Sequence, residues 1–326
     1  MELRLTRARK IYSDGRHNAF TSIASAFGQT FVVFRAATNH GSPDGTIKVI
    51  ASADHERWTT VADLAIPGSD LRDPTILVFN GTLLVVCEEE YDGRFGTLVF
   101  PSTDGTTFGD PLPVNGLPAD RWLWHAQPHG GRLYATGYSN RDGEDYASLY
   151  ASDDAGHWET LLDFPFPCNE VYLDFDRDGV LWALAREDNH GRIPTLYTID
   201  APYTSVRSGK RLPIKLVGPM VKRLDGGCVL IGRNWDDPGI RNLRTDLYWL
   251  ADGHDVQLVR TLPSGGDTSY AAWQDQGPGR AVISYYSAHE HMMSYPHPEH
   301  LKPGQEEERA ECVTAADIFL ADLSYV

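Results

Sequence analysis

A tyrosine, a glutamate, an aspartate and an arginine stand where the chain enters or leaves short apolar runs. In "LPSGGDTSYAAW" (262–273), Asp267 and Tyr270 lie between two glycines and an apolar run. Glu170 is near the start of "NEVYLDF", and Arg186 ends "LWALAR". A turn explains the glycines and strands explain the apolar runs, but neither requires these polar residues. Their types suit proton transfer and the binding of a polar or anionic ligand.

The elements that must position these residues are marked by a repeat. The segments "SADHERW" (52–58), "STDGTTF" (102–108) and "SDDAGHW" (152–158) share Ser-x-Asp-x-x-x-aromatic, with the serines fifty positions apart. We expect a tight turn in which the aspartate accepts backbone N–H bonds and the aromatic ring packs on a sheet edge. A period near this length, with short strands, is typical of β-propellers.

Aligned on this period, the chain divides into six units whose first strands begin near residues 17, 72, 124, 169, 218 and 267. A glycine-containing turn then leads to a second strand, and a third follows. Residues 1–12 are left over and would add the outer strand of the sixth unit, which removes an open sheet edge. The sequence therefore predicts an all-β fold: a single six-bladed β-propeller domain over residues 1–326, with four-stranded antiparallel blades.

In a propeller the first strand of each blade runs along the central axis and the second runs back. The start of the first strand and the end of the second therefore lie on one face, which we call the mouth. Charged residues at loop ends are usually only solvated, but all six units place functional residue types here, which favours a polar funnel above a packed core. The candidates at the mouth are His17, Asn18, Arg35, His40, Asp44, Arg72, Asp73, Glu88, Glu89, Glu90, His125, Gln127, Glu170, Arg186, Arg233, Asp267, Tyr270, Tyr286 and His289.

Through its six units and three repeated turns, nearly the whole chain resembles the sialidase superfamily, and more closely bacterial sialidase-like propeller proteins with Asp-box turns. The resemblance implies a tyrosine nucleophile, Tyr270, activated by Glu170. It also implies that Asp44, in "NHGSPDG", is the acid/base. Arginines that hold a substrate carboxylate are implied as well: Arg186, and Arg241 or Arg244 in "GIRNLRTDLYWL".

One element departs from the family pattern. Where the first arginine of the family stands in an Arg-Ile-Pro element, this chain reads "HNAFTS" (17–22). Arg35 or Arg72 could substitute from a neighbouring position, and substrates other than sialic acid become credible. The residues predicted to bind substrate are Arg35, His40, Arg72, Asp73, His125, Arg186, Arg233, Arg241, Arg244, Asp267, Tyr286 and His289.

The implied reaction is the retaining, exo-acting hydrolysis of a terminal, anionic sugar. Free tyrosine has a pKa of about 10, so it attacks well only if a base such as Glu170 takes its proton. A tyrosine suits a sugar whose own anion would repel a carboxylate nucleophile. Asp44 would protonate the leaving oxygen and then activate water. Structural roles are also open: Tyr270 in the core, Glu170 as an arginine's partner, and Asp44 in a Pro-Asp-Gly turn.

Two other functions are open on the sequence alone. One is a related hydrolase or lyase for another sugar or small metabolite, with His40, His125 or His289 as the base. The other is a glycan-binding propeller without turnover. The His- and Glu-rich segment 287–311 is predicted to be a flap over the funnel. Neither this segment nor the four widely spaced cysteines shows a zinc-ligand pattern, so no metal or cofactor is expected.

Charge and hydropathy limit the partners. The formal net charge is −16 and no block of Lys and Arg is present, which argues against nucleic acid or an anionic membrane. The sequence has no signal-peptide pattern and no run of ~18 apolar residues, so we expect a cytoplasmic location. The expected partner is a small molecule or an oligosaccharide.

Overall fold

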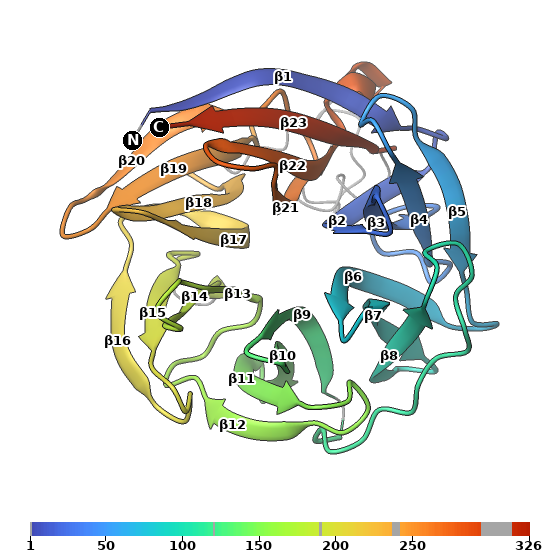
Figure 1. The fold of residues 1–326 in the computed structure, drawn as a ribbon, viewed down its shortest axis with the longest axis horizontal. Coiled ribbons are helices and arrows are strands. Elements are labelled where there is room, and N and C mark those ends of the chain that lie inside the picture. The colour runs from blue at the N-terminus through green and yellow to red at the C-terminus, as the bar shows by residue number, and fades with distance from the viewer. Residues whose placement is uncertain (1, 120, 189–190, 237–241, 295–314) are drawn as a thin grey trace, which may run out of the picture.

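The computed structural model is a ring of six antiparallel sheets around a central axis (Figure 1). It describes residues 2–119, 121–188, 191–236, 242–294 and 315–326. The prediction of an all-β, six-bladed β-propeller is therefore confirmed. In these described ranges no helix is long and apolar enough to cross a membrane.

The blades follow one another along the chain, each with its first strand nearest the axis (Figure 1). Blade one is β2 (His17–Ala26), β3 (Gln29–Ala37), β4 (Thr46–Ser52) and β5 (Thr59–Leu64). Blade two is β6 (Asp70–Phe79), β7 (Thr82–Tyr91) and β8 (Arg94–Ser102). Blade three is β9 (Trp122–His129), β10 (Arg132–Arg141), β11 (Glu144–Ser152) and β12 (Glu159–Asp163).

The second half of the ring repeats this order. Blade four is β13 (Val171–Phe175), β14 (Leu181–Ala185), β15 (Thr195–Ile199) and β16 (Val206–Arg211). Blade five is β17 (Leu216–Leu224), β18 (Gly227–Asn234), β19 (Thr245–Ala251) and β20 (Val256–Thr261). Blade six is β21 (Thr268–Asp275), β22 (Arg280–Ser287), β23 (Asp317–Tyr325) and β1 (Leu3–Tyr12), with a short 3-10 helix, η2 (His289–Ser294), after β22.

The N-terminal strand closes the ring, as the sequence predicted. β1 pairs antiparallel with β23, in a register that runs from Leu3 opposite Tyr325 to Tyr12 opposite Ile318. The two ends of the chain therefore lie side by side on the rim (Figure 1). Blade two differs from the prediction of four strands. Among the described residues its sheet has three strands, and an isolated bridge between Val99 and Leu112 marks the outer edge.

Five of the six inner strands carry one extra residue near their mouth end. Such bulges bend a strand and re-aim its side chains. The register shifts fall at Ala19/Ser22 in β2, Arg72/Thr75 in β6, Leu123/His125 in β9, Val217/Met220 in β17 and Ser269/Ala272 in β21.

The bulges give left-handed backbone at positions that face the axis. Phe20 has φ 61°, Asp73 has φ 44°, Gly218 has φ 58° and Tyr270 has φ 47°. Phe20, Asp73 and Tyr270 line one cavity on the axis, together with Trp124 from the bulge of β9. The repeated irregularity thus directs side chains from separate blades into a common space.

The three repeated turns have the hydrogen bonds that their spacing predicts. In each turn one aspartate oxygen accepts two successive backbone N–H groups: Asp54 from Glu56 and Arg57, Asp104 from Thr106 and Thr107, and Asp154 from Gly156 and His157. Trp158 of the third turn is 1% exposed and packs with Leu77, Val86 and Leu133 between blades two and three. Trp58 of the first turn is only partly buried.

Trp158→Ala is expected to lower the free energy of unfolding by about 3–5 kcal/mol, because it leaves a large cavity in a close-packed core. The matched variant Trp58→Ala should lower it much less, because that ring is already partly in water. Denaturant unfolding followed by circular dichroism measures both. Equal losses in the two variants would contradict the burial described here.

Candidate active site

A buried carboxylate joins the sixth and fourth blades at the mouth. The hydroxyl of Tyr270, in β21, donates to Oε1 of Glu170, just before β13, at 2.5 Å. Nη1 of Arg186, just after β14, donates to the same oxygen at 2.7 Å. Glu170 is 5% exposed, and its Oε2 is buried with no hydrogen-bond partner among the described residues. The fold thus brings together the tyrosine, the glutamate and one arginine that the sequence singled out.

The backbone holds Tyr270 in an uncommon conformation. Tyr270 has φ 47° and Ser269 has φ 114°, and such non-glycine residues cost on the order of 1–3 kcal/mol each. The Tyr270 ring lies edge-on to Phe20, with the ring centroids 4.7 Å apart. It also lies against Gly218, where an added Cβ would come within 2.9 Å of the ring. Strain of this kind persists where the surroundings fix it, and it clusters at functional sites.

Charge and burial set the protonation of this cluster. Burial raises the pKa of the Tyr270 hydroxyl well above its usual value, and the charge of Glu170 adds to the rise while Arg186 opposes it. The phenol is therefore protonated at neutral pH and needs a base before it can attack. Burial acts to lower the pKa of Arg186, but the charges of Glu170, Tyr270 and Asp188 raise it well above the ordinary value. Arg186 stays charged beside Glu170.

Asp73, in the bulge of β6, is a second carboxyl in the same environment. Its Oδ1 is buried with no hydrogen-bond partner among the described residues. Burial raises the pKa of Asp73 to about 7, and the charge of Glu170 adds to the rise, against the opposing charges of Arg72, His40 and Arg35. Near neutral pH such a carboxyl can either give or take a proton.

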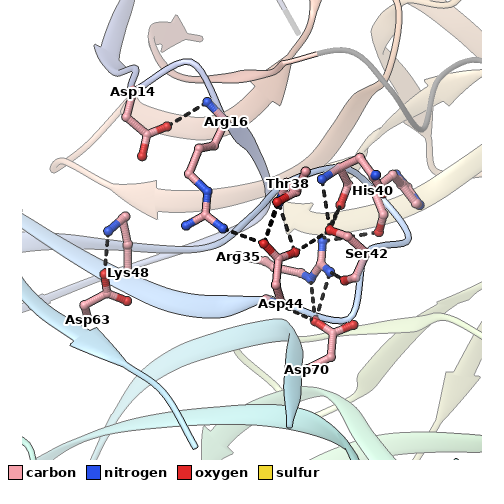
Figure 2. Close-up of polar contacts among 12 residues, drawn as sticks. Asp14, Arg16, Arg35, Thr38, His40, Ser42, Asp44, Lys48, Asp63 and Asp70 are labelled. Atoms are coloured by element: carbon pink, nitrogen blue, oxygen red, sulfur yellow. Dashed lines mark hydrogen bonds and ion pairs between the residues drawn. The ribbon is translucent and has the colours of Figure 1, made fainter. Parts of the chain in front are cut away.

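Arg35, which the sequence offered as a substitute clamp for substrate, is used by the protein itself (Figure 2). It is fully buried, and its five N–H groups donate to Oδ1 of Asp70 and to three backbone carbonyls in the loop 39–42. Oδ2 of Asp70 accepts from Nε of Arg72 at 2.6 Å, and Arg72 also lies 3.5 Å from Glu90. These arginines shape the β3–β4 loop and the start of blade two.

Asp44, the predicted acid/base, is held within its own loop (Figure 2). Its carboxylate accepts bonds from the backbone N–H and hydroxyl of Thr38, from the hydroxyl of Ser42 and from Arg16. Partial burial acts to raise the pKa of Asp44, but the bonds from Ser42 and Thr38 and the charge of Arg16 hold it well below its usual value. A carboxyl that is always ionised is a poor proton donor, so this geometry does not favour the predicted role.

Asp267 is the centre of a second buried cluster. Its Oδ1 accepts from Nη2 of Arg233 at 2.7 Å and from the hydroxyl of Tyr286 at 2.6 Å. Its Oδ2 accepts from Nε2 of His17 at 2.8 Å and from Nδ1 of His40 at 2.7 Å. We call these four donors the Asp267 cage. The carboxylate is 1% exposed, so its charge is satisfied within the protein.

The two histidines and Asp267 also have donor types that a metal ion could use. The three ligand atoms lie within 4.8 Å of one another. Both imidazoles already donate to the carboxylate, however, and Arg233 places a positive charge on its other oxygen. The second nitrogen of His17 is buried without a partner among the described residues, whereas a metal-bound imidazole usually donates a hydrogen bond from it. Hydrogen bonding explains the cluster better than a metal does.

A cavity of about 30 Å³ lies on the axis beside Tyr270 and Asp73, with walls from all six inner strands. It holds about one water molecule, so a sugar would bind on the mouth side of Tyr270. His125 lines this cavity with its ring stacked on Tyr172 at 3.8 Å. Burial lowers the pKa of His125 to about 3, so this histidine is neutral at physiological pH.

Of the remaining predicted residues, some make contacts outside the Tyr270–Glu170 cluster and some are outside the described part of the chain. Nη1 of Arg244 donates to the carbonyl of Leu243, and His289 lies beside the hydroxyl of Ser287. Arg241 and most of the predicted flap, residues 295–311, are outside the described residues. Sequence reasoning missed the walls formed by Phe20 and Trp124 and the contact of Asp188 with Arg186. The position of "HNAFTS" and "WHAQPH" at the start of inner strands was the available indication.

No family model and no curated protein sequence matches this chain. Solved structures do match it. A protein of unknown function from Dyadobacter fermentans has a TM-score of 0.78 at 17% identity, with 99% of each chain covered. A Penicillium chrysogenum alpha-L-arabinanase complexed with arabinobiose has a TM-score of 0.66 at 13% identity, over 97% of this chain and 98% of that chain.

Trypanosoma rangeli sialidase has a TM-score of 0.64 at 12% identity, over 94% of this chain and 55% of that chain. This chain therefore shares its propeller fold with these proteins. At these identities the likeness concerns the fold alone, and this chain spans about half the length of the sialidase.

The raised pKa of Asp73 predicts how stability depends on pH. The folded protein keeps this proton up to about pH 7, whereas an unfolded aspartate loses it at about pH 4. The free energy of unfolding should therefore fall as pH rises from about 4 to 7, by at most ~1.4 kcal/mol per pH unit from this group. Asp73→Asn should make that fall shallower.

Denaturant unfolding at a series of pH values measures the slope. Asp44→Asn is the control, because the pKa of Asp44 is held low and its contribution is lost only in more acidic solution. A slope in Asp73→Asn equal to that of the unchanged protein would contradict the assignment.

Proposed function

We propose that this protein is a retaining glycoside hydrolase that attacks a terminal sugar with Tyr270, using Glu170 as its base. The observation that carries the proposal is the 2.5 Å hydrogen bond from the Tyr270 hydroxyl to Glu170. A neutral phenol becomes a nucleophile when a base within hydrogen-bond reach takes its proton as it attacks. The likeness in fold to a sialidase and an arabinanase agrees with this class of reaction.

In the first step the Tyr270 oxygen bonds to the anomeric carbon while Glu170 takes its proton. The bond from that carbon to the leaving oxygen breaks, and Asp73 donates a proton to the leaving oxygen. In the second step Asp73 takes a proton from water, whose oxygen bonds to the anomeric carbon. The bond to Tyr270 breaks, and Glu170 returns the proton to the phenol. Two displacements at one carbon retain its configuration.

Asp73 is assigned the acid/base role in place of Asp44 for two reasons. Its pKa of about 7 lets it hold a proton near neutral pH and give it up, whereas that of Asp44 is held well below the usual value. Asp73 also lines the same cavity as Tyr270, while the hydrogen bonds of Asp44 run to its own loop and to Arg16. Arg186 orients Glu170 through the hydrogen bond from its Nη1 to Oε1.

Tyr270→Phe removes only the attacking oxygen and is expected to lower kcat on the true substrate by about 10³-fold or more. Initial rates of sugar release measure this, with thermal unfolding as a check that the variant folds. Tyr172→Phe is the matched control, because Tyr172 lines the same cavity but makes no hydrogen bond with Glu170 in the described structure. Activity retained in Tyr270→Phe would overturn the proposal.

Asp73→Asn is expected to lower kcat by about 10²–10⁴-fold for a sugar leaving group. The loss should be smaller for a 4-nitrophenyl glycoside, whose leaving group needs little protonation. The fall of kcat/KM above about pH 7 should disappear in the variant, because this fall reports the loss of the Asp73 proton. An unchanged pH profile would place the acid/base elsewhere.

One observation favours a second candidate, a hydrolase or lyase with His40 as the base. Nδ1 of His40 is bonded to the buried carboxylate of Asp267, and a carboxylate orients an imidazole and stabilises its charged form in the same way in other enzymes. On this alternative His40→Ala abolishes turnover and Tyr270→Phe does not. The opposite result supports the tyrosine mechanism.

A further inference from the structure

The Asp267 cage has the composition of an anion-binding site. A guanidinium, a phenol and two imidazoles converge on one carboxylate at 2.6–2.8 Å. This donor set would suit the carboxylate of an acidic sugar, because charge-assisted bonds from arginine and from polar N–H and O–H groups hold such an anion. Here the carboxylate belongs to the chain itself.

The carboxylate that fills the cage cannot leave it easily. Asp267 stands directly before β21, and its carbonyl accepts the N–H of Ala288 at 2.9 Å. The side chains of Asp267 and His17 are fully buried. The four donors of the cage are therefore already bonded to Asp267 and are not available to an incoming anion. The negative charge of Asp267 would also repel that anion.

Three other arginines near the mouth, Arg186, Arg35 and Arg72, are also paired with the protein's own carboxylates. Arg186 donates to Glu170 and Asp188. All five N–H groups of Arg35 have partners within the chain. Arg72 lies against Asp70 and Glu90. Each of these three guanidinium groups is therefore already neutralised by a carboxylate of the protein.

Two buried carboxylate oxygens in the site accept no hydrogen bond from the described residues. Oδ1 of Asp73 and Oε2 of Glu170 have no partner among the described residues. A buried acceptor without a donor costs free energy that a bound hydroxyl group would recover. The hydroxyl groups of a sugar supply donors of this kind.

We propose that the mouth accepts an uncharged glycoside, with Asp267 filling the position that would hold the carboxylate of an acidic sugar. This inference rests on the proposed glycosidase function and names its substrate class. It departs from the anionic sugar that the sequence resemblance implied. Sugar hydroxyl groups then donate to Asp73 and Glu170.

The first test compares 4-nitrophenyl glycosides of uncharged pentoses and hexoses with 4-nitrophenyl glycosides of glucuronic acid and sialic acid. At least one uncharged glycoside should be cleaved, with kcat/KM about 100-fold or more above that of either acidic one. Faster cleavage of an acidic glycoside would overturn the substrate class and leave the glycosidase function standing. Cleavage of none would count against the glycosidase function itself.

The second test does not need turnover. Calorimetry measures the binding of N-acetylneuraminic acid and of its uncharged methyl ester to the unchanged protein and to Asp267→Asn. The unchanged protein should not prefer the acid. Asp267→Asn empties the cage of its negative charge, so it should gain a preference for the acid of about tenfold or more.

Asp44→Asn is the matched control, because it removes one negative charge beside the mouth and leaves the cage filled. It should gain no preference. Circular dichroism checks that Asp267→Asn folds, and the first test decides alone if it does not. A folded Asp267→Asn without the gain, or a tenfold preference for the acid in the unchanged protein, would overturn the role of Asp267.

Discussion

The extra residue in the inner strands is the constraint on which the rest of the site depends. A regular strand that runs along the axis would alternate its side chains between the two blade faces. The bulges break this alternation near the mouth and direct Phe20, Asp73, Trp124 and Tyr270 to one cavity. The lost ladder pairing and the left-handed backbone at Tyr270 are offset by ring packing on Phe20 and by the bond to Glu170. A Cβ at position 218 would come within 2.9 Å of the ring of Tyr270, so the glycine lets the ring pack here without a shift.

The buried carboxylates at the mouth need partners of opposite charge, and arginines of the same chain supply them. Asp70, Glu170 and Asp267 each pair with an arginine from another strand or loop. These pairs link blades one and two, the neighbouring strands β13 and β14 of blade four, and blades five and six. Removing one partner of such a pair leaves an uncompensated buried charge, so the pairs hold the geometry rather than add much net stability. Asp73 has no hydrogen-bond partner at its Oδ1 among the described residues, and burial together with the charge of Glu170 raises its pKa.

Much of the fold was predictable from the sequence, because short-range patterns encode it. The Ser-x-Asp repeat gave the period, and the unpaired N-terminal run gave the closing strand. Tyr270 and Glu170 were singled out because each stands where the chain enters an inner strand, and a hydrogen bond joins them in the structure. The bulges were not predictable, because an extra residue is defined only by the register with the neighbouring strand. For the same reason the sequence did not indicate that Asp73 lines the same cavity as Tyr270.

The pairing of Arg35 with Asp70 was hidden as well, because the two residues lie 35 positions apart on different blades. Nothing in the local sequence distinguishes an arginine that clamps a ligand from one that holds a loop. The fourth strand of blade two was predicted from the pattern of the other blades. The chain at Leu112 makes only one bridge with β8 among the described residues.

The closing strand has a consequence for the order in which the molecule can be assembled. Blade six contains Asp267, Tyr270 and Tyr286, and its sheet joins β1 to β23 from the opposite end of the chain. On a ribosome the first strand emerges early but has no partner until the last strand is made. A chain that stops before β23 keeps β21, which carries the tyrosine, and its partner β22, but β1 then has no strand to pair with. The blade that carries Tyr270 therefore reaches its four-stranded form only after β23 has been made.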